Sequence, residues 1–189
     1  MPDAGRVIAG TARSIRLDAP GPGTRPLGDR VKQTLFAILE PDLTGAAVLD
    51  LFAGSGAAGI EALSRGAGRA TFVERDPGAV RVIQANLERT GLADRAMVAR
   101  AAVATWLGDP ARVADAPVDV VFVDPPYDEP ATLAAALERL APLLAPGARV
   151  VAKHFWRDVP PASIGLLASE RERRFGETAL TFYRRQEDR

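Results

Sequence analysis

The feature that most constrains the fold is the alternation of short apolar runs with amphipathic segments from Ala46 onward. Five runs have the length and composition of buried strands: AVLDLF (47–52), ATFVE (70–74), RAMVARA (95–101), VDVVFV (118–123) and ARVVAKHF (148–155). Between them, helical periodicity marks residues 57–66, 78–91 and 131–144. Continuous apolar strands that alternate with helices are typical of a mainly parallel sheet with helices on both faces. The sequence therefore predicts an α/β fold of the Rossmann-like kind.

The two ends of the chain depart from this rhythm. Residues 6–17 predict a small β-hairpin that turns near Gly10, and the linker APGPGTRP follows it. A helix is then expected from Gly28 or Asp29 to Pro41, with Val31, Leu35, Ile38 and Leu39 on its apolar face. Residues 171–185 predict a closing antiparallel pair that turns at Gly176. We divide the chain into residues 1–27, the hairpin extension and linker, and residues 28–189, the main domain.

Composition and charge narrow the class of protein. The 189 residues include no cysteine and one histidine, so a thiolate metal site and disulfides are excluded, and we expect no metal. No run approaches the length of a membrane helix, and we see no signal peptide, so a cytoplasmic protein is expected. Residues 1–40 carry six Arg or Lys against four Asp or Glu, residues 41–148 nine against fourteen, and residues 149–189 nine against six. Basic ends are compatible with a polyanion partner, although a solvated Arg-rich surface explains them equally simply.

A glycine-rich turn after the first strand indicates a nucleotide-containing cofactor. The stretch from Asp50 to Gly59, DLFAGSGAAG, contains G-x-G-x-x-G at a strand-to-helix junction, where backbone N–H groups are available to a ligand. Glu74 ends the next strand, about 20 residues on, where a ribose-binding acid is expected. Asp50 stands inside the strand, where a carboxylate could reach the amine of an amino-acid tail, or else cap the following helix. A nicotinamide-dependent enzyme remains an alternative at this point.

The fourth strand ends in VFVDPPY, and this motif indicates the chemistry. Asp124 follows the strand directly, at the edge of a parallel sheet where such folds bind ligands. Pro125 and Pro126 stiffen the backbone and lack N–H donors, so the loop offers acceptors only. Tyr127 adds a flat ring on which a base can stack. A carboxylate and a rigid carbonyl suit an amino group on an aromatic base, whereas the simpler interpretation of DPP is a plain turn.

Taken together, VLDLFAGSGAAGIEALSRGA, VER and VFVDPPY resemble a class I S-adenosylmethionine-dependent methyltransferase. The segments RVIAGTARSIRL, TRPLGDRVKQTLFAIL and FGETALTFY narrow the resemblance to the RsmD-type bacterial family, which methylates the exocyclic N2 of a guanine in 16S rRNA. The resemblance implies a seven-stranded methyltransferase sheet, and an N-terminal hairpin that helps to hold RNA. It also implies 16S rRNA as partner, within an assembled or assembling small ribosomal subunit, and a monomeric protein.

The resemblance also implies site residues. The acceptor base would be held by Asp124, Pro125, Pro126 and Tyr127. S-adenosylmethionine, with S-adenosylhomocysteine as product, would lie against Asp50, Phe52, Ala53, Gly54, Ser55, Gly56, Glu74 and Ala102. RNA would contact the basic residues Arg6, Arg13, Arg16, Arg25, Arg30 and Lys32.

Three positions depart from the family pattern. Leu27 replaces a usual Thr, Lys153-His154 replaces a common acid, and Ala102 stands where a polar residue often meets the adenine, so that a backbone N–H must serve there. His154 is expected to be a surface or capping residue, and Trp106 and Trp156 packing residues. Four other classes stay open: a base-amine methyltransferase such as a DNA adenine N6 enzyme, a protein-glutamine methyltransferase, a nicotinamide-dependent oxidoreductase, and a cofactor-binding assembly factor.

Overall fold

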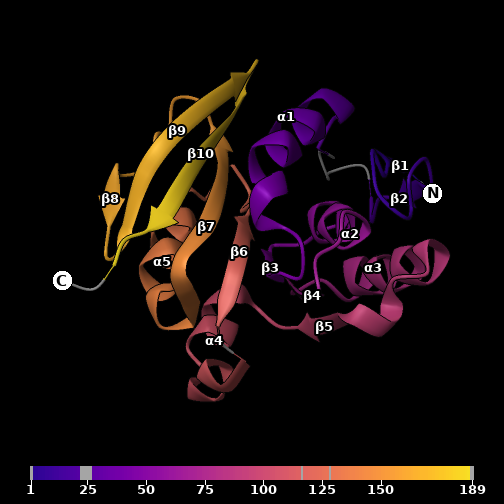
Figure 1. The fold of residues 1–189 in the computed structure, drawn as a ribbon, viewed down its shortest axis with the longest axis horizontal. Helices are drawn as coiled ribbons and strands as arrows, with labels where there is room; N and C mark the ends of the chain where they lie inside the picture. Colours follow the sequence, from indigo (N-terminus) through magenta and orange to yellow (C-terminus); the bar gives the residue numbers. More distant parts are fainter. Residues whose placement is uncertain (1, 22–26, 116, 128, 188–189) are drawn as a thin grey trace.

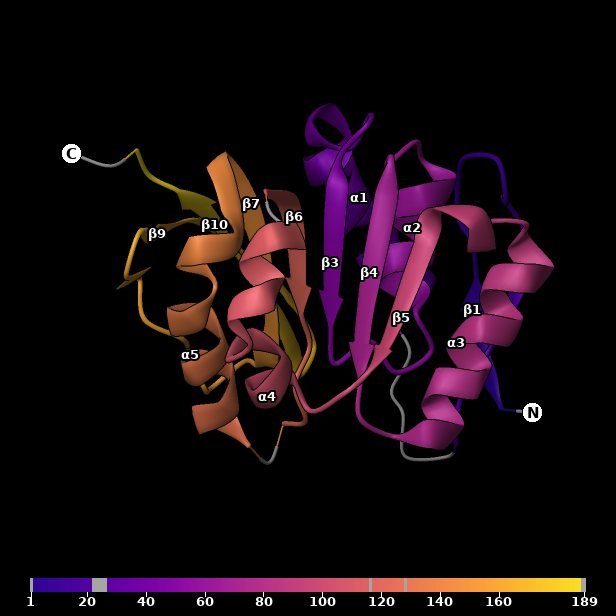
Figure 2. The same cartoon turned by 90° about the horizontal axis from the view of Figure 1, so that it is seen from below.

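A computed structural model describes residues 2–21, 27–115, 117–127 and 129–187, and within them one large sheet forms the centre of the molecule (Figures 1 and 2). Its strand order is β5-β4-β3-β6-β7-β10-β9-β8. The parallel part comprises β3 (Ala47–Leu51), β4 (Arg69–Glu74), β5 (Ala96–Arg100), β6 (Val118–Val123) and β7 (Leu144–Phe155). The antiparallel part comprises β8 (Ser163–Ile164), β9 (Leu167–Phe175) and β10 (Thr178–Arg185). The predicted α/β fold is confirmed; the sheet exceeds the predicted seven strands by the two-residue β8.

Helices cover both faces of the sheet, as predicted. On one face lie α1 (Asp29–Leu39), α2 (Ala57–Ser64) and α3 (Pro77–Thr90), which share a hydrophobic core with the inward side chains of the strands. On the other face lie α4 (Val103–Leu107) and α5 (Pro130–Arg139), with a core of their own (Figure 2). Short 3-10 turns occupy Glu40–Asp42, Ala93–Arg95, Pro110–Asp115 and Ala141–Leu143. None of the described helices has the length and apolarity needed to cross a bilayer.

The topology explains where a ligand site must lie. From β3 the chain passes through α2 to β4 and then outward to β5, before it returns to β6 on the opposite side of β3. The crossovers on the two sides of β3 therefore run in opposite directions, which opens a crevice beyond the carboxyl ends of β3 and β6. The glycine-rich turn follows β3 and the Asp-Pro-Pro-Tyr motif follows β6. Both motifs consequently lie at the same point of the sheet.

The N-terminal extension forms the predicted hairpin and packs firmly on the main domain. Its strands β1 (Asp3–Arg6) and β2 (Arg16–Asp18) are antiparallel. The backbone N–H groups of Ile8 and Ala9 donate to the two carboxylate oxygens of Glu61, at 2.8 and 3.0 Å, and Glu61 is fully buried on α2. Five apolar side chains of the extension belong to the α1–α3 core: Ala4, Val7, Ala12, Leu17 and Ala19.

Helix α1 has the predicted position but a rotated buried face. The residues that it buries are Lys32, Leu35, Phe36 and Leu39. Val31 and Ile38, which we expected on that face, are only half-buried. The ammonium group of Lys32 donates to the backbone carbonyl of Arg6, and burial lowers the pKa of Lys32 while the nearby Glu61 carboxylate opposes this fall. The hairpin therefore supplies the polar partner that allows a lysine to occupy a core position.

Candidate active site

A cleft of about 980 Å³ lies beyond the carboxyl ends of β3 and β6. Its walls combine the glycine-rich turn, the end of β4, the start of α4 and the acceptor motif after β6. The predicted cofactor and acceptor residues that line it are Asp50, Phe52, Ala53, Gly54, Ser55, Glu74, Ala102, Asp124, Pro125, Pro126 and Tyr127. The fold thus brings together side chains that are up to 77 positions apart in the chain. Only Gly56, among the predicted residues of these two groups, is not part of the wall.

The turn between β3 and α2 is built from residues with positive φ. Phe52, Gly54 and Gly56 have φ values of 60°, 55° and 76°. For Phe52 this conformation is strained, because its Cβ crowds the backbone in the left-handed region. A Cβ on Gly56 would also approach the side chain of Ile83 to 3.2 Å. Strain of this kind persists where the surrounding structure fixes it, and it clusters at ligand sites.

Asp50 is buried in β3, with only 3% of its surface exposed. Its Oδ2 accepts a hydrogen bond of 2.9 Å from the N–H of Gly59, in the first turn of α2. Gly59 allows α2 to approach the sheet this closely, because a Cβ there would lie 2.4 Å from the ring of Phe72 and 3.2 Å from Asp50 Oδ2. One carboxyl oxygen of Asp50 therefore caps α2, which was one of the two roles expected for this residue. Asp50 also lines the cleft. Burial raises the pKa of Asp50 to about 8, and the Gly59 hydrogen bond only partly opposes the rise.

Glu74 joins the two loops that face the cofactor side of the cleft. Its Oε2 accepts from the N–H of Gly54 and its Oε1 from the N–H of Asp76, both at 2.9 Å. Each carboxylate oxygen can accept a second hydrogen bond, so these contacts orient the group without exhausting it. Glu74 stands at the end of β4 as predicted, and a ribose hydroxyl in the cleft would meet an acceptor that is already fixed in place.

Ala102 is the N-cap of α4, a short helix that the sequence did not predict. The residues 101–104 line the cleft, so the first turn of this helix faces it. The first N–H groups of a helix have no intrahelical partner. The backbone donor that we expected near Ala102 is therefore available from the first turn of α4, and the Ala102 side chain does not supply it.

Asp124 follows β6 and forms an ion pair with Lys153 on β7. The distance from Lys153 Nζ to Asp124 Oδ2 is 2.7 Å. The Asp124 side chain is 32% exposed, whereas that of Lys153 is 10% exposed. Burial raises the pKa of Asp124, and the Lys153 ammonium opposes that rise. Lys153, which departs from the family pattern, therefore contacts Asp124 directly, and Asp124 is the residue predicted to hold the acceptor base.

The rest of the acceptor motif is held by contacts that the sequence does not show. The N–H of Glu129 donates to the Pro126 carbonyl at 3.1 Å, so this carbonyl already closes a turn. The carbonyl of Pro125 is then the better candidate to accept from a base amine. The hydroxyl of Tyr127 lies 2.8 Å from the hydroxyl of Thr178 on β10, and this hydrogen bond fixes the ring. An immobilised aromatic ring is a suitable platform for a planar base.

Comparison with known proteins agrees with this geometry. Residues 5–184 match the family described as "Conserved hypothetical protein 95". The chain belongs to this family. It is 36% identical over 183 residues to a Bacillus subtilis protein named "Putative rRNA methyltransferase YlbH", an alignment that covers 95% of this chain and 98% of that one. It is 42% identical over 123 residues to Ribosomal RNA small subunit methyltransferase D of Escherichia coli K12, an alignment that covers 65% of this chain and 60% of that protein.

Solved structures place the chain in the same family. An E. coli structure named "Putative methyltransferase yhhF" superposes with a TM-score of 0.84 at 34% identity, and covers 96% of this chain and 97% of its own. The RsmD-type resemblance of the motifs is therefore confirmed, and the fold is that of a class I methyltransferase.

The cleft of this RsmD-family protein fits S-adenosylmethionine in charge and in donor set. Asp50, Glu74 and Asp124 put three carboxyl groups on its walls, which suits a ligand that carries an ammonium and a sulfonium group. The turn after β3 and the start of α4 offer backbone N–H groups. Among the described residues no cluster of His, Asp and Glu has the form of a metal site.

The predicted RNA-contacting residues behave differently from one another. Arg13 and Arg30 are exposed, Arg6 pairs with Asp29 at 3.1 Å, and Arg16 pairs with Asp3 at 2.8 Å, both on the surface. These four positions remain compatible with phosphate contacts. The predicted contact of Lys32 is wrong in this conformation, because the side chain is fully buried against the hairpin carbonyl of Arg6. Arg25 lies outside the described residues.

Three further residues do not have the expected surroundings. His154 is buried, with Nε2 2.9 Å from the Thr181 hydroxyl and Nδ1 2.8 Å from the Phe155 carbonyl, so it is a structural residue of the sheet rather than a surface one. Trp106 is a packing residue as expected. Trp156 is instead half-exposed, and two arginines lie over its ring. Sequence reasoning missed Thr178 altogether, and found Lys153 only as a departure from a pattern.

Proposed function

We propose that the protein is an rRNA methyltransferase that transfers a methyl group from S-adenosylmethionine to the exocyclic N2 of a guanine in 16S rRNA. The observation that carries the proposal is the position of Asp124-Pro125-Pro126-Tyr127, which lines the same cleft as the glycine-rich turn and Glu74. The names of the relatives support rRNA of the small subunit as substrate, and the acceptor motif supports an exocyclic amine as the methylated group.

In this proposal each residue of the cleft has its own role in the reaction. S-adenosylmethionine supplies an electrophilic methyl group when it is bound. Asp124 accepts one hydrogen of the guanine NH₂ group, and the Pro125 carbonyl accepts the other, which turns the nitrogen lone pair away from the ring system. Positive charge develops on N2 during attack, and the Asp124 carboxylate stabilises it more strongly than it stabilises the neutral amine. After transfer, the surplus proton on N2 leaves toward the same carboxylate.

The ion pair with Lys153 describes Asp124 as it stands before RNA binds. The Lys153 ammonium donates to Asp124 Oδ2, so one carboxylate oxygen is already engaged. The second oxygen retains its capacity to accept from the amine. Burial in the cleft raises the pKa of Asp124, and the Lys153 ammonium opposes this rise because it favours the ionised carboxylate.

A base inside a duplex or stack cannot enter such a cleft, so the guanine must be flipped out or already unpaired. We further propose that the substrate is the small subunit, assembled or assembling, that the enzyme acts as a monomer in the cytoplasm, and that the exposed arginines of residues 1–27 contact RNA phosphates. A DNA adenine N6 methyltransferase is the second candidate, because the acceptor motif also suits that amine.

The test uses small subunits isolated from a strain that lacks this enzyme. They are incubated with the purified protein and radiolabelled S-adenosylmethionine, and the rRNA is digested to nucleosides for mass spectrometry. We expect N2-methylguanosine from 16S rRNA, and no label in DNA added as a control. Label on another nucleoside would overturn the guanine-N2 assignment, and label only in DNA would favour the second candidate.

A further inference from the structure

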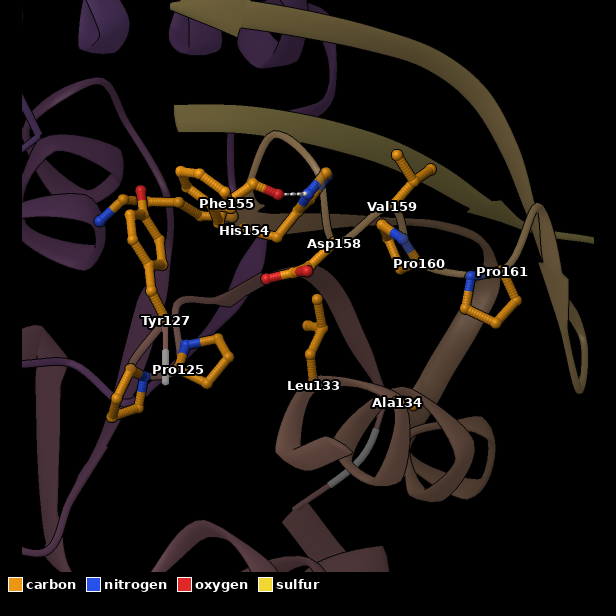
Figure 3. A pocket seen from close by; sticks show the side chains of 12 residues that line it. Pro125, Tyr127, Leu133, Ala134, His154, Phe155, Asp158, Val159, Pro160 and Pro161 are labelled. Atoms are coloured by element: carbon orange, nitrogen blue, oxygen red, sulfur yellow. Dashed lines mark hydrogen bonds between the residues drawn. The ribbon is translucent and has the colours of Figure 1, made fainter. Parts of the chain in front are cut away.

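A second, smaller cavity of about 260 Å³ adjoins the acceptor motif (Figure 3). It shares Pro125, Pro126, Tyr127 and Lys153 with the large cleft, so the motif stands between the two spaces. The remaining wall comes from α5, from the end of β7 and from the segment that follows it. Its lining is mostly apolar or aromatic, and includes Leu133, Ala134, Phe155, Val159 and Pro160.

Aromatic rings continue from this cavity to the surface. The ring centroids of Tyr127 and Phe155 are 6.3 Å apart, and those of Phe155 and Trp156 are 6.2 Å apart. Phe155 and Trp156 are half-buried, and neither belongs to the two hydrophobic cores. Val159, which also lines the cavity, is 63% exposed, which is unusual for a large apolar side chain among the described residues. An aromatic row that leads out of an acceptor site offers stacking surfaces to successive bases.

Positive charge lies at the outer end of the row. The guanidinium carbon of Arg174 is 3.6 Å from the Trp156 ring centroid, and that of Arg157 is 4.9 Å from it. Arg174 also donates from Nε to the Gly176 carbonyl at 2.9 Å, so its head group is fixed while its remaining N–H groups can still donate. Stacking on the indole therefore holds two cations ready for an anion, as is typical of phosphate recognition by arginine.

The position of Asp158 indicates where the base and the phosphate of a nucleotide would lie. It lines the cavity between Phe155 and Val159 and is exposed. A carboxylate there repels a phosphate but accepts from the N–H groups of a base, and the Lys153 ammonium in the same wall is already paired with Asp124. The base therefore belongs inside the cavity and the phosphate belongs outside it, on the arginines.

We propose that this cavity binds the base of a nucleotide next to the target guanine in single-stranded RNA, and that Arg157 and Arg174 bind its phosphate. The inference rests on the proposed function, and it adds a contact surface on the β7–β9 side of the cleft to the one expected from residues 1–27. It also explains why Trp156 is not packed in the core, since its role is to hold the arginines.

Two pairs of variants test the proposal. Ala134→Phe fills the cavity, whereas Ala135→Phe adds the same ring at the next, exposed position of α5, outside the lining. Arg174→Ala removes a cation from the row, whereas Arg171→Ala removes one from the same strand, where its neighbours are residues of α1 such as Thr34. The readouts are the KM for isolated small subunits, the affinity for a fluorescein-labelled eight-nucleotide RNA at several salt concentrations, and the affinity for S-adenosylhomocysteine as a check on folding.

We expect Ala134→Phe to raise the KM by about 5- to 150-fold, which is the range that one stacked base contributes. Arg174→Ala should weaken the binding of the oligonucleotide and lower the salt slope by about 0.7, the value for one phosphate contact on a single strand. Affinity for S-adenosylhomocysteine should not change, and both control variants should behave as wild type.

The outcomes separate this inference from the proposed function. If wild type methylates small subunits while Ala134→Phe and Arg174→Ala match their controls, the second-base site is overturned and the proposed function stands. If Arg171→Ala weakens binding as much as Arg174→Ala, the arginines act as general surface charge and the assignment of the phosphate is overturned. If wild type methylates no rRNA, both proposals are overturned.

Discussion

At the scale of single residues, Asp124 is the group on which turnover should depend most. Asp124→Ala removes the carboxylate that we propose stabilises charge on the attacking nitrogen, and we expect turnover to fall by on the order of 10²–10³-fold with little change in cofactor affinity. Asp124→Asn keeps hydrogen bonding without charge and should fall between. Single-turnover methylation of isolated small subunits measures this. A wild-type rate for Asp124→Ala would show that the carboxylate is structural.

Lys153 should set the pH at which Asp124 works. Its ammonium opposes the rise in the pKa of Asp124, so Lys153→Met should raise that pKa further. The acid limb of kcat/KM should then move to higher pH, because Asp124 becomes protonated at a higher pH. Lys153→Arg retains a cation and should leave the profile close to wild type. The measurement is the pH profile of methylation, and an identical acid limb in Lys153→Met would refute the role of the ion pair.

Asp50 should make cofactor binding depend on pH. Burial raises its pKa to about 8 from the ordinary 3.8, so the unliganded protein holds a proton there at neutral pH and loses the associated stability as the pH rises between these values. An ammonium group in the cleft favours the ionised form, so S-adenosylhomocysteine should bind more tightly as the pH approaches 8, with release of up to about one proton. Calorimetry in buffers of different ionisation enthalpy measures the release, and Asp50→Asn should abolish it.

At the scale of elements, the hairpin is joined to α2 by a contact that tolerates no side chain. A Cβ on Gly10, whose φ is +86°, would lie 1.8 Å from the Ser64 carbonyl oxygen. Gly45 has a similar φ of +74° but open space around it, and it is the matched control. Gly45→Ala should cost about 1–2 kcal/mol in free energy of unfolding from backbone strain alone. Gly10→Ala should cost about 1–3 kcal/mol more, because the added methyl group must displace the helix.

Urea unfolding of both glycine variants measures the difference. Equal losses would mean that the hairpin tip moves away from α2 at little cost. The same contacts explain why the hairpin is better probed by point substitutions than by its removal. Without it, the carboxylate of Glu61 would lose its two backbone donors and keep the Arg65 Nε–H, and the loss of donors to a buried carboxylate is costly.

The sequence predicted elements better than it predicted contacts between them. Strand periodicity and glycine positions located β3, β4 and β6 and their ligand-binding ends, because these signals are local. The five-residue α4 was not predicted, since it is too short for a helical period to show in the sequence. Lys32 was misassigned, because its partner is a backbone carbonyl 26 residues away. The Asp124–Lys153 and Tyr127–Thr178 pairs depend on strand register, which no local pattern encodes.

At the scale of the whole molecule, the free energy of unfolding should depend on which ligand the cleft binds. A ligand that binds only the folded state stabilises it, by about 2.7 kcal/mol at a concentration 100 times its Kd. For a chain of this size that corresponds to a rise in Tm of roughly 5–10 °C. We expect this rise with S-adenosylhomocysteine and none with NADH, because the carboxyl groups around the glycine-rich turn suit an ammonium group rather than a pyrophosphate. Differential scanning calorimetry tests it, and the reverse preference would favour the nicotinamide alternative.

The strand order also has a consequence for biosynthesis. β10 is made after the other strands that the structure describes, yet it inserts between β7 and β9, and it carries the Thr178 hydroxyl that fixes the Tyr127 ring. A nascent chain that ends before residue 178 already contains the residues of the glycine-rich turn and of the parallel strands. It has no fixed acceptor ring, however, and the edge of β7 remains unpaired. We therefore expect the Tyr127 ring to be fixed only after β10 has been synthesised and has paired with β7.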